Sequence, residues 1–272
     1  MNIRTDIALE RQELIADSNK KGVKVEKQKQ GKVEIVTVNI ISPEGEKIME
    51  KPMGKYITVD LPEFSHESEL LDSRLDILTK IIKDLVPKEA KTFLIAGLGN
   101  ENITPDALGP LCAKKIFSTR HFENFAQIQQ HLPKLNPVAS ISTGVLGQTG
   151  IETAEYISGI VKLINPDVVI IVDALASSKI SSLGKTVQLS NTGITPGSGV
   201  GNFRKAIDKS SLGVPVISIG VPTVVDLEED NTMFVTPKEI DTIISRAAGL
   251  LSLSINCALQ PNLEAEMFLA LS

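Results

Sequence analysis

The order of apolar and polar positions changes twice along the chain. Residues 33–41 are rich in β-branched side chains, and within 36–40 the apolar residues alternate with Thr and Asn. Alternation of this kind predicts a half-buried strand. A Ser-Pro-Glu-Gly run at 42–45 predicts a turn, and apolar positions alternate again over 57–61. We therefore expect residues 33–61 to form an antiparallel pair or a small sheet.

The rest of the chain has the pattern of an α/β protein. Helical spacing of Leu and Ile predicts an amphipathic helix over 67–86, and Pro87 ends it. The run at 167–173 is continuously apolar between two acids, as in a strand buried on both faces. We expect further strands at 92–96, 138–141, 186–189 and 214–219, and helices at 105–118, 150–164, 201–208, 237–254 and 262–270. This alternation predicts one α/β domain, a three-layer, mostly parallel sheet flanked by helices, with 33–61 as an N-terminal β elaboration.

Composition and charge narrow the function classes. The 272 residues are 42% hydrophobic and 4% aromatic, with a net charge of −5. An acidic chain with few aromatic rings is a poor candidate for direct nucleic-acid binding. We interpret the lysine-rich residues 20–32 as a solvated, mobile surface segment rather than an arm for an anionic partner. No signal peptide and no apolar run of membrane-spanning length is evident, so we expect a cytoplasmic protein without membrane contact.

Two aspartates stand where an α/β fold places its ligands. Asp173 directly follows the predicted strand 168–172, at the carboxyl edge of the sheet. Asp106 follows another strand, in a run where Thr104 can cap a helix that starts at Pro105. Taken alone, Asp106 would only complement the dipole of that helix. If the two strands are neighbours, the carboxylates share a crevice and one proton, and they can activate water on a peptide bond.

Glycine-rich loops are the other candidates for the site. A Gly-Leu-Gly-Asn turn follows the strand at 92–96, but Asn102 stands where a dinucleotide-binding fingerprint needs a glycine. A tight turn and a close backbone approach explain these glycines better. The loop 193–202 offers N–H donors to an anion or an oxyanion, unless it merely connects two elements. A weaker acid, Asp226, closes the last strand, where Thr223 could position it.

Motifs for other hydrolase classes are missing. The sequence contains no Gly-x-Ser-x-Gly, no His-Glu-x-x-His and no zinc-type spacing of Cys and His. The histidines, His66, His121 and His131, do not lie at predicted strand ends, and we expect surface or structural roles for them. The residues that we select to support the site are Gly97, Gly99, Asn100, Gly197, Ser198, Gly199, Thr223 and Asp226.

Five segments together resemble one protein family over nearly the whole chain. The segments are Gly97–Asn100 with Thr104–Pro110, Val172–Ala176, Pro196–Asn202, Ile219–Asp226, and Arg4–Ala8 at the N-terminus. The first four resemble conserved motifs of the germination protease (spore protease) of spore-forming Firmicutes, and the last resembles its autoprocessing site. The resemblance implies an atypical aspartic endopeptidase with Asp106 and Asp173 as the catalytic pair. It also implies a fold similar to that of the hydrogenase maturation proteases.

The resemblance implies a function in detail. The chain would be a zymogen with a propeptide of residues 1–6 and a single peptidase domain of residues 7–272, self-cleaved between Asp6 and Ile7. It would initiate degradation of small acid-soluble spore proteins in the spore core during germination, as a homotetramer. It would cut after Glu or Asp, before a hydrophobic residue that Ala follows. No cofactor and no metal ligand is expected, since Thr195 stands where several relatives carry a histidine.

Two other functions stay open at this point. One is a nickel-dependent protease of the hydrogenase-maturation type, against which the long N-terminal sheet and the Ile7-Ala8 pair argue. The other is a non-catalytic α/β module that binds an anion through residues 197–201. Two acids at one edge of a sheet argue against the second, because like charges are costly to keep close together.

Overall fold

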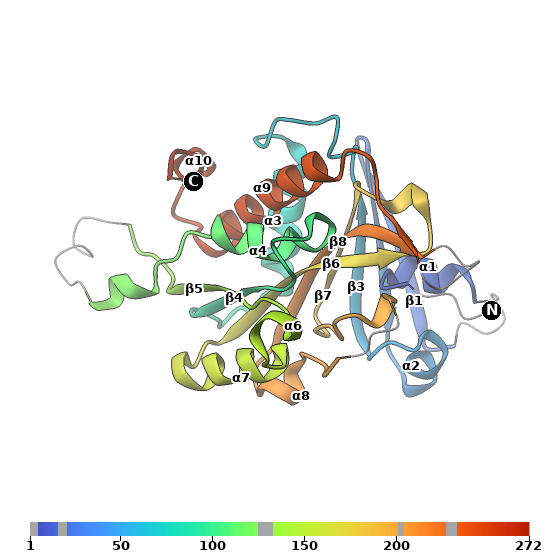
Figure 1. Ribbon diagram of the computed structural model, residues 1–272, viewed down its shortest axis with the longest axis horizontal. Coiled ribbons are helices and arrows are strands. Elements are labelled where there is room, and N and C mark those ends of the chain that lie inside the picture. The colour runs from blue at the N-terminus through green and yellow to red at the C-terminus, as the bar shows by residue number, and fades with distance from the viewer. Residues whose placement is uncertain (1–4, 16–20, 125–132, 201–203, 227–232, 272) are drawn as a thin grey trace.

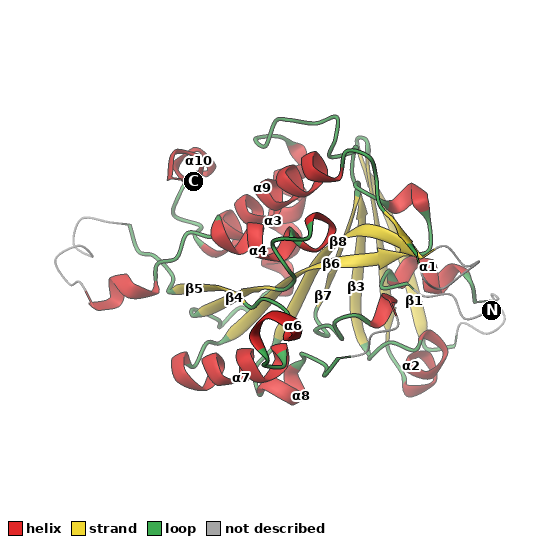
Figure 2. Ribbon diagram, viewed as in Figure 1, coloured by secondary structure: helices red, strands yellow, loops and turns green. Residues whose placement is uncertain are grey.

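The computed structural model describes residues 5–15, 21–124, 133–200, 204–226 and 233–271. A twisted central sheet has helices packed on both of its faces, which gives the three layers of an α/β fold (Figures 1 and 2). The strands lie in the order β1-β2-β3-β7-β8-β6-β4-β5, and β9 pairs with β8 outside this path. Their bounds are β1 Val23–Gln30, β2 Val33–Ile40, β3 Gly54–Asp60, β4 Phe93–Gly97, β5 Val138–Ser142, β6 Val168–Ser177, β7 Thr186–Ser190, β8 Val216–Asp226 and β9 Phe234–Val235.

The helices cover the two faces unequally. The described α-helices are α1 Ala8–Glu13, α2 Pro43–Met49, α3 Ser73–Leu85, α4 Leu108–Lys114, α6 Leu146–Thr149, α7 Thr153–Ile164, α8 Lys209–Leu212, α9 Ile240–Leu259 and α10 Ala265–Leu271. In Figure 1, α3, α4 and α9 lie over one face of the sheet, and α7 and α8 lie under the other. A large hydrophobic core fills the first interface and a smaller core fills the second. The site therefore rests on strands that are buried on both sides.

The sheet has a parallel half and an antiparallel half. The pairs β5–β4, β4–β6 and β6–β8 are parallel, while every pair from β1 through β7 to β8 is antiparallel. The predicted α/β sheet with flanking helices is confirmed, and the β-rich segment 33–61 does carry two strands. That segment continues the same sheet, because β3 pairs with β7 edge to edge. The sheet as a whole is therefore mixed rather than mostly parallel.

Three local predictions were wrong. The lysine-rich segment is exposed, as expected, but it is regular structure rather than a loose segment: residues 23–30 form the edge strand β1, because β2 offers its full length for pairing. The expected turn at 42–45 begins α2 instead, where the Ser42 hydroxyl accepts a hydrogen bond from the Gly45 N–H and caps the helix. Of the helix expected at 201–208, residues 201–203 lie outside the described residues, and 204–208 are not helical.

Among the described residues, helix α9 is the one helix long and apolar enough to cross a membrane by length and composition. Most of it is buried within the protein. Its Ile243, Ala247 and Leu251 side chains belong to the larger core. The hydrophobicity of α9 is thus explained by its position over the sheet.

Candidate functional site

Asp106 and Asp173 lie at neighbouring strands, as the sequence required for a shared crevice. The β4–β6 pair sets Gly97 opposite Val172, one residue before Asp173. Asp173 is 8% exposed, and its Oδ1 accepts a hydrogen bond of 2.9 Å from the Ala174 N–H. Asp106 reaches the same place from the chain segment that follows β4, where its Oδ2 accepts a 2.7 Å hydrogen bond from the Asn100 N–H.

The local structure around both acids differs from the sequence-based expectation. Strand β6 does not end before Asp173 but runs on to Ser177, because β8 also continues and pairs with it along this length. Asp106 closes a short 3₁₀ turn, Thr104–Asp106, whose N-cap is Ile103 rather than Thr104. Helix α4 begins only at Leu108. The Asp106 carboxylate is therefore held by the Asn100 loop and not by a helix dipole.

Glycines let the Asp106 segment approach the sheet. Gly99 has a φ of 114°, and a Cβ there would lie 2.0 Å from the Asp106 carbonyl oxygen. A Cβ at Gly97 would lie 2.0 Å from the carbonyl oxygen of Gly109 in α4. Real Cβ atoms do not come so close, so only glycine fits at either position. The close backbone approach expected from the Gly-Leu-Gly-Asn turn is confirmed.

Burial perturbs the pKa of both carboxyl groups, and charge repulsion adds to the shift at Asp173. Burial raises the pKa of Asp173 well above its ordinary value, and the charges of Asp106 and Asp6 raise it further. Burial also raises the pKa of Asp106, although the hydrogen bond from Asn100 lowers it. The arrangement can therefore keep a proton on Asp173 while Asp106 is ionised, the division of states that general acid–base chemistry uses.

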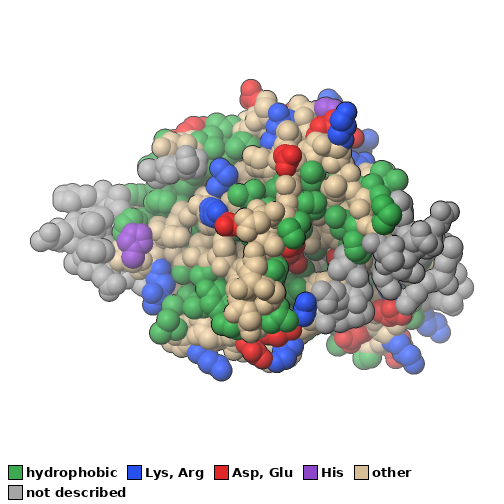
Figure 3. Space-filling view, viewed as in Figure 1, with side chains coloured by type: hydrophobic (Ala, Val, Ile, Leu, Met, Phe, Trp, Pro, Cys, Tyr) green, Lys and Arg blue, Asp and Glu red, His purple; other side chains and the backbone are tan. Residues whose placement is uncertain are grey.

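Both acids line a cavity of about 620 Å³. Its wall also includes Asp6, Gly99, Gly197 and Thr223, together with apolar residues of several loops. The face drawn in Figure 3 is hollowed near its middle, and acidic side chains are visible inside the hollow. A cavity of this size can hold a few residues of an extended peptide.

The N-terminal segment reaches this cavity, which no local sequence pattern indicates. The Asp6 N–H donates to the Ala176 carbonyl at 3.0 Å, and the Ala176 N–H donates to Asp6 Oδ2 at 2.9 Å. Asp6 Oδ1 accepts a hydrogen bond of 2.7 Å from the Ser198 hydroxyl. A Cβ at Gly199 would lie 2.3 Å from Asp6 Oδ2, so this glycine makes room for the carboxylate. Residues 5–7 therefore dock beside β6 within the candidate site.

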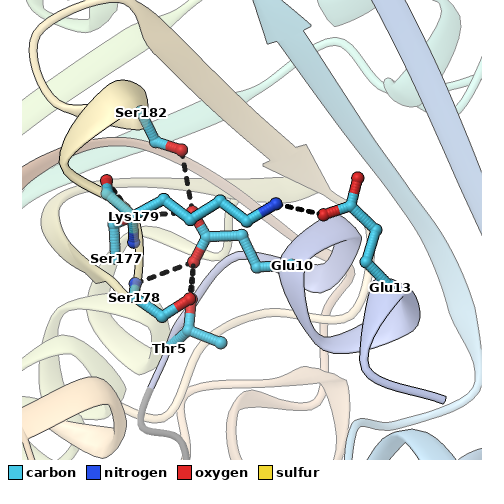
Figure 4. A network of polar contacts seen from close by, with 7 residues as sticks. All are labelled: Thr5, Glu10, Glu13, Ser177, Ser178, Lys179 and Ser182. Carbon is cyan, nitrogen blue, oxygen red and sulfur yellow. Dashed lines mark hydrogen bonds and ion pairs between the residues drawn. The ribbon is translucent and has the colours of Figure 1, made fainter. Parts of the chain in front are cut away.

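Glu10 anchors the same segment from inside α1. Its carboxylate is 3% exposed and accepts hydrogen bonds from the hydroxyls of Thr5, Ser177, Ser178 and Ser182 and from the Ser178 N–H. Figure 4 shows these side chains converging on Glu10, while Lys179 turns outward to Glu13. Burial alone would raise the pKa of Glu10, but the hydrogen bonds outweigh it and the pKa is lowered. The sequence analysis missed this cluster, since a lone Glu near the N-terminus gives no signal.

The carbonyl oxygen of Asp6 has contacts of its own. It accepts hydrogen bonds from Lys51 Nζ at 3.0 Å and from Gln188 Nε2 at 2.7 Å. These two residues line a second cavity of about 230 Å³, which shares Asp6 and Leu175 with the larger one. Sequence reasoning missed both residues. For Gln188 the available signal was a long polar side chain in the middle of a short apolar strand.

The remaining residues that the sequence analysis selected have fewer contacts with the two acids or with Asp6. Gly197 lines the larger cavity, and the Asn100 Oδ1 accepts a hydrogen bond from Gln148. Thr223 is buried at the cavity wall, and its carbonyl accepts a bond from the Thr236 hydroxyl. The last strand, expected to end at Ile219, runs on to Asp226 as β8, and the Asp226 side chain lies outside the described part of the structure. The expected link between Thr223 and Asp226 therefore stays a prediction.

Residues 193–200 of the glycine-rich loop are described, and the expected backbone anion site there stays a prediction. The Ser198 N–H is used within the loop, where it donates to the Thr195 carbonyl, and the Ser198 hydroxyl binds the Asp6 carboxylate. His66 is exposed beside Glu63, and His131 is not among the described residues. Across the described ranges no group of three or more His, Cys, Asp or Glu side chains is placed to hold a metal ion.

Known proteins resemble this chain over most of its length. The sequence model of a family described as Germination protease matches residues 3–230. A germination protease from Clostridium tetani is 37% identical over 98% of this chain and 98% of its own length. Another, from Caldanaerobacter subterraneus, is 41% identical over 98% and 97%. Among solved structures, the NiFe hydrogenase maturation protease HycI from Thermococcus kodakarensis gives a TM-score of 0.40 at 20% identity, covering 64% of this chain and 98% of that one.

Proposed function

Because this chain belongs to the germination protease family and is a protease, we propose that it is an endopeptidase that initiates degradation of small acid-soluble spore proteins during spore germination. The observation that carries this proposal is the carboxyl pair. Asp173 is buried, its pKa is raised by burial and by Asp106, and both acids line one cavity. Such a pair is suited to activating water on a peptide bond.

In the proposed mechanism each carboxyl group has one task. The ionised Asp106 takes a proton from water as the water oxygen attacks the scissile carbonyl carbon. The protonated Asp173 gives its proton to the departing amide nitrogen. The C–N bond breaks and leaves a new carboxylic acid and a new amine, while the pair still holds one proton, now on Asp106. No metal is assigned a role in these steps.

We propose that the chain is a zymogen and that it cleaves itself between Asp6 and Ile7. The docking of Asp6 supports this, since Asp6 of the same chain lines the cavity that Asp106 and Asp173 line. Residues 1–6 are then the propeptide and 7–272 the single peptidase domain. The preference for an acid before the bond, a hydrophobic residue after it and Ala next corresponds to Asp6, Ile7 and Ala8.

The cellular setting completes the proposal. Small acid-soluble spore proteins are the proposed substrates, the spore core is the proposed location, and a homotetramer is the proposed stored form. These three statements rest on family membership. Light scattering on the full chain tests the assembly, because a monomer at micromolar concentration would contradict the tetramer.

The intact mass of the full chain after mildly acidic incubation tests the catalytic proposal. We would compare the parent with Asp106→Asn and Asp173→Asn, each with and without a chelator. Loss of residues 1–6 in the parent alone, with or without chelator, supports a metal-free pair that acts on the Asp6–Ile7 bond. The same loss in both variants means that the cut comes from elsewhere and rejects the pair. A loss that chelator prevents favours the metal-dependent alternative.

A further inference from the structure

The two hydrogen bonds to the Asp6 carbonyl oxygen come from side chains that lie far from Asp6 along the chain. Gln188 comes from β7, in the antiparallel half of the sheet, and is 9% exposed. Its amide group spans the next residue of the segment: Nε2 donates to the Asp6 carbonyl at 2.7 Å, and Oε1 accepts from the Ala8 N–H at 2.6 Å. One side chain thus holds the two peptide groups that flank Ile7, and the first of these is the Asp6–Ile7 bond.

Lys51 brings a positive charge to the same oxygen. Lys51 is half-buried as a residue, and burial lowers the pKa of its ammonium group. The charges that face it are Asp6, which raises the pKa, and Arg11, which lowers it. The ammonium also lies 5.9 Å from the centre of the Tyr56 ring. A buried cation 3.0 Å from a neutral carbonyl oxygen polarises that carbonyl strongly, because the surrounding dielectric is low.

We propose that Lys51 and Gln188 are catalytic residues that stabilise the negative charge developing on the scissile carbonyl oxygen. This inference rests on the proposed function, in which the Asp6–Ile7 bond is the one cleaved. As water adds to the Asp6 carbonyl carbon, the C=O π electrons move to the oxygen, and the ammonium and the amide N–H stabilise the resulting negative charge by hydrogen bonds. When the C–N bond breaks, the oxygen returns to a carbonyl and both donors are unchanged.

The placement of the two groups of residues agrees with this division of tasks. Asp106 and Asp173 line the larger cavity, whereas Lys51 and Gln188 line the smaller one. Asp6 lines both, so its peptide group lies at the shared wall. The carbonyl oxygen is thus bound by two residues of the smaller cavity, whereas both acids line the larger one. Donors fixed in advance at the oxygen are the arrangement that makes electrostatic stabilisation effective.

A simpler role must be separated from this one. The same contacts would also hold the N-terminal segment in place without any effect on the chemical step. The two roles differ in what a substitution changes. Loss of a mere clamp releases the segment, whereas loss of a catalytic donor leaves the segment docked and slows the cleavage.

The test uses the full chain and two readouts at matched protein concentration. Intact mass gives the rate constant of self-cleavage, and amide hydrogen exchange at Asp6 and Ala176, before acidification, reports whether the segment is docked. We expect Lys51→Met to slow cleavage by about 10²–10³-fold with exchange unchanged. Lys51→Arg, which restores the charge, should recover most of the rate. Lys47→Met, an exposed lysine of α2, is the matched control and should cleave like the parent.

A second variant and one control keep the test decisive. Gln188→Met keeps the side-chain length but lacks the amide, and it should slow cleavage by a similar factor if Lys51→Met does not fold. Faster exchange together with a proportionate loss of rate in both variants would reduce Lys51 and Gln188 to a clamp. Cleavage at the parental rate in either folded variant would also overturn the inference. Asp173→Asn, measured in the same experiment, distinguishes a failure of this inference from a failure of the proposed function. If Asp173→Asn cleaves itself at the parental rate, the proposed function itself has failed.

Discussion

Asp173 and Gln188 project from the same face of the sheet. They belong to one row of residues paired across β6, β8 and β7, and Gly220 of β8 is the residue between them. Strand β8 sets Gly220 opposite Asp173 on one side and opposite Gln188 on the other. Directly opposed residues point to one face, so the acid and the amide lie two strand spacings apart, about 10 Å. The hydrogen-bond register of three strands thus places a proposed proton donor and a proposed oxyanion donor on either side of one peptide.

Gly220 is part of this relationship. A Cβ at that position would lie 2.6 Å from Cγ of Leu175, whose side chain covers the glycine. Leu175 lines both cavities and so forms the floor between them. A larger residue at position 220 would push Leu175 toward the docked segment. The row therefore depends on a residue without a side chain at its centre.

We expect Asp173→Asn to stabilise the protein at neutral pH. The folded-state pKa of Asp173 is raised, so the folded state holds a proton that the unfolded chain has lost. Between the ordinary Asp pKa and the raised one, stability falls as pH rises, and Asn removes this penalty. The melting temperature at pH 7 should rise by about 2–4 °C for each kcal/mol recovered. The gain should shrink toward pH 4.

Asp84→Asn provides the control for this measurement. Asp84 is exposed in the last turn of α3, and its loss should change stability by no more than about 0.5 kcal/mol. Thermal unfolding of parent and variants between pH 4 and pH 8 gives the comparison. An Asp173→Asn protein that melts below the parent at pH 7 would show that the buried carboxyl group is a net stabilising partner.

Gly199→Ala should displace Asp6 from the site. The new Cβ would lie 2.3 Å from Asp6 Oδ2, and the carboxylate would have to leave Ser198 and the Ala176 N–H. We expect faster hydrogen exchange at Ala176 and self-cleavage slowed by about tenfold or more, which corresponds to 1.4 kcal/mol. Gly159→Ala in α7, where a Cβ meets nothing within 4 Å, is the control. Unchanged exchange in Gly199→Ala would mean that Asp6 is not held where the structure puts it.

Much of the fold was predictable because parallel strands buried on both faces appear in the sequence as continuous apolar runs. The strands at 93–97 and 168–172 are continuous apolar runs, since both of their faces are covered. The same property hid the real length of β6. Beyond Asp173 the sequence Ala-Leu-Ala-Ser has the composition of a helix start, and only pairing with β8 keeps it extended. Tertiary pairing decided the structure where local propensity was neutral.

The site was predictable where it depends on strand ends and unpredictable where it depends on docking. The proximity of Asp106 and Asp173 could be predicted because each comes after an apolar run of a parallel strand, and these runs end at one edge of the sheet. Nothing in the sequence connects Asp6 with Ser198 or with Gln188, which lie far away along the chain. Those contacts exist only because β3 joins β7 and carries the N-terminal elaboration to the site.

Self-cleavage should be fastest at mildly acidic pH. The mechanism needs a protonated Asp173 and an ionised Asp106, and both pKa values are raised, that of Asp173 strongly. The rate should fall as pH rises through the raised Asp173 pKa and fall again when acid protonates Asp106. Rate constants from intact mass between pH 4 and pH 8, at constant ionic strength, give the profile. A rate that increases steadily up to pH 8 would contradict the assigned proton states.

Glu10→Gln should weaken the attachment of the N-terminal segment. The Glu10 carboxylate accepts hydrogen bonds from four hydroxyls and a backbone N–H, and Gln can accept at only one oxygen. We expect a loss of at least about 1.5–3 kcal/mol, the value of one hydrogen bond to a charged group. Because the folded-state pKa is lowered, the contribution of Glu10 is present above the unfolded pKa and lost as pH falls through the folded one.

Glu13→Gln is the matched control, because it removes a carboxylate one turn further along the same segment. Glu13 makes an exposed ion pair with Lys179, and such pairs contribute no more than about 1 kcal/mol. Thermal unfolding of both variants at pH 7 and pH 4 should show a large difference from the parent only for Glu10→Gln, and mainly at pH 7. Cleavage after Asp6 removes Thr5, one of the hydroxyl donors, but leaves the three serines in place. The cleaved protein should therefore still lose stability on Glu10→Gln. Equal melting temperatures of the cleaved parent and the cleaved Glu10→Gln variant would show that Glu10 no longer anchors the new N-terminus.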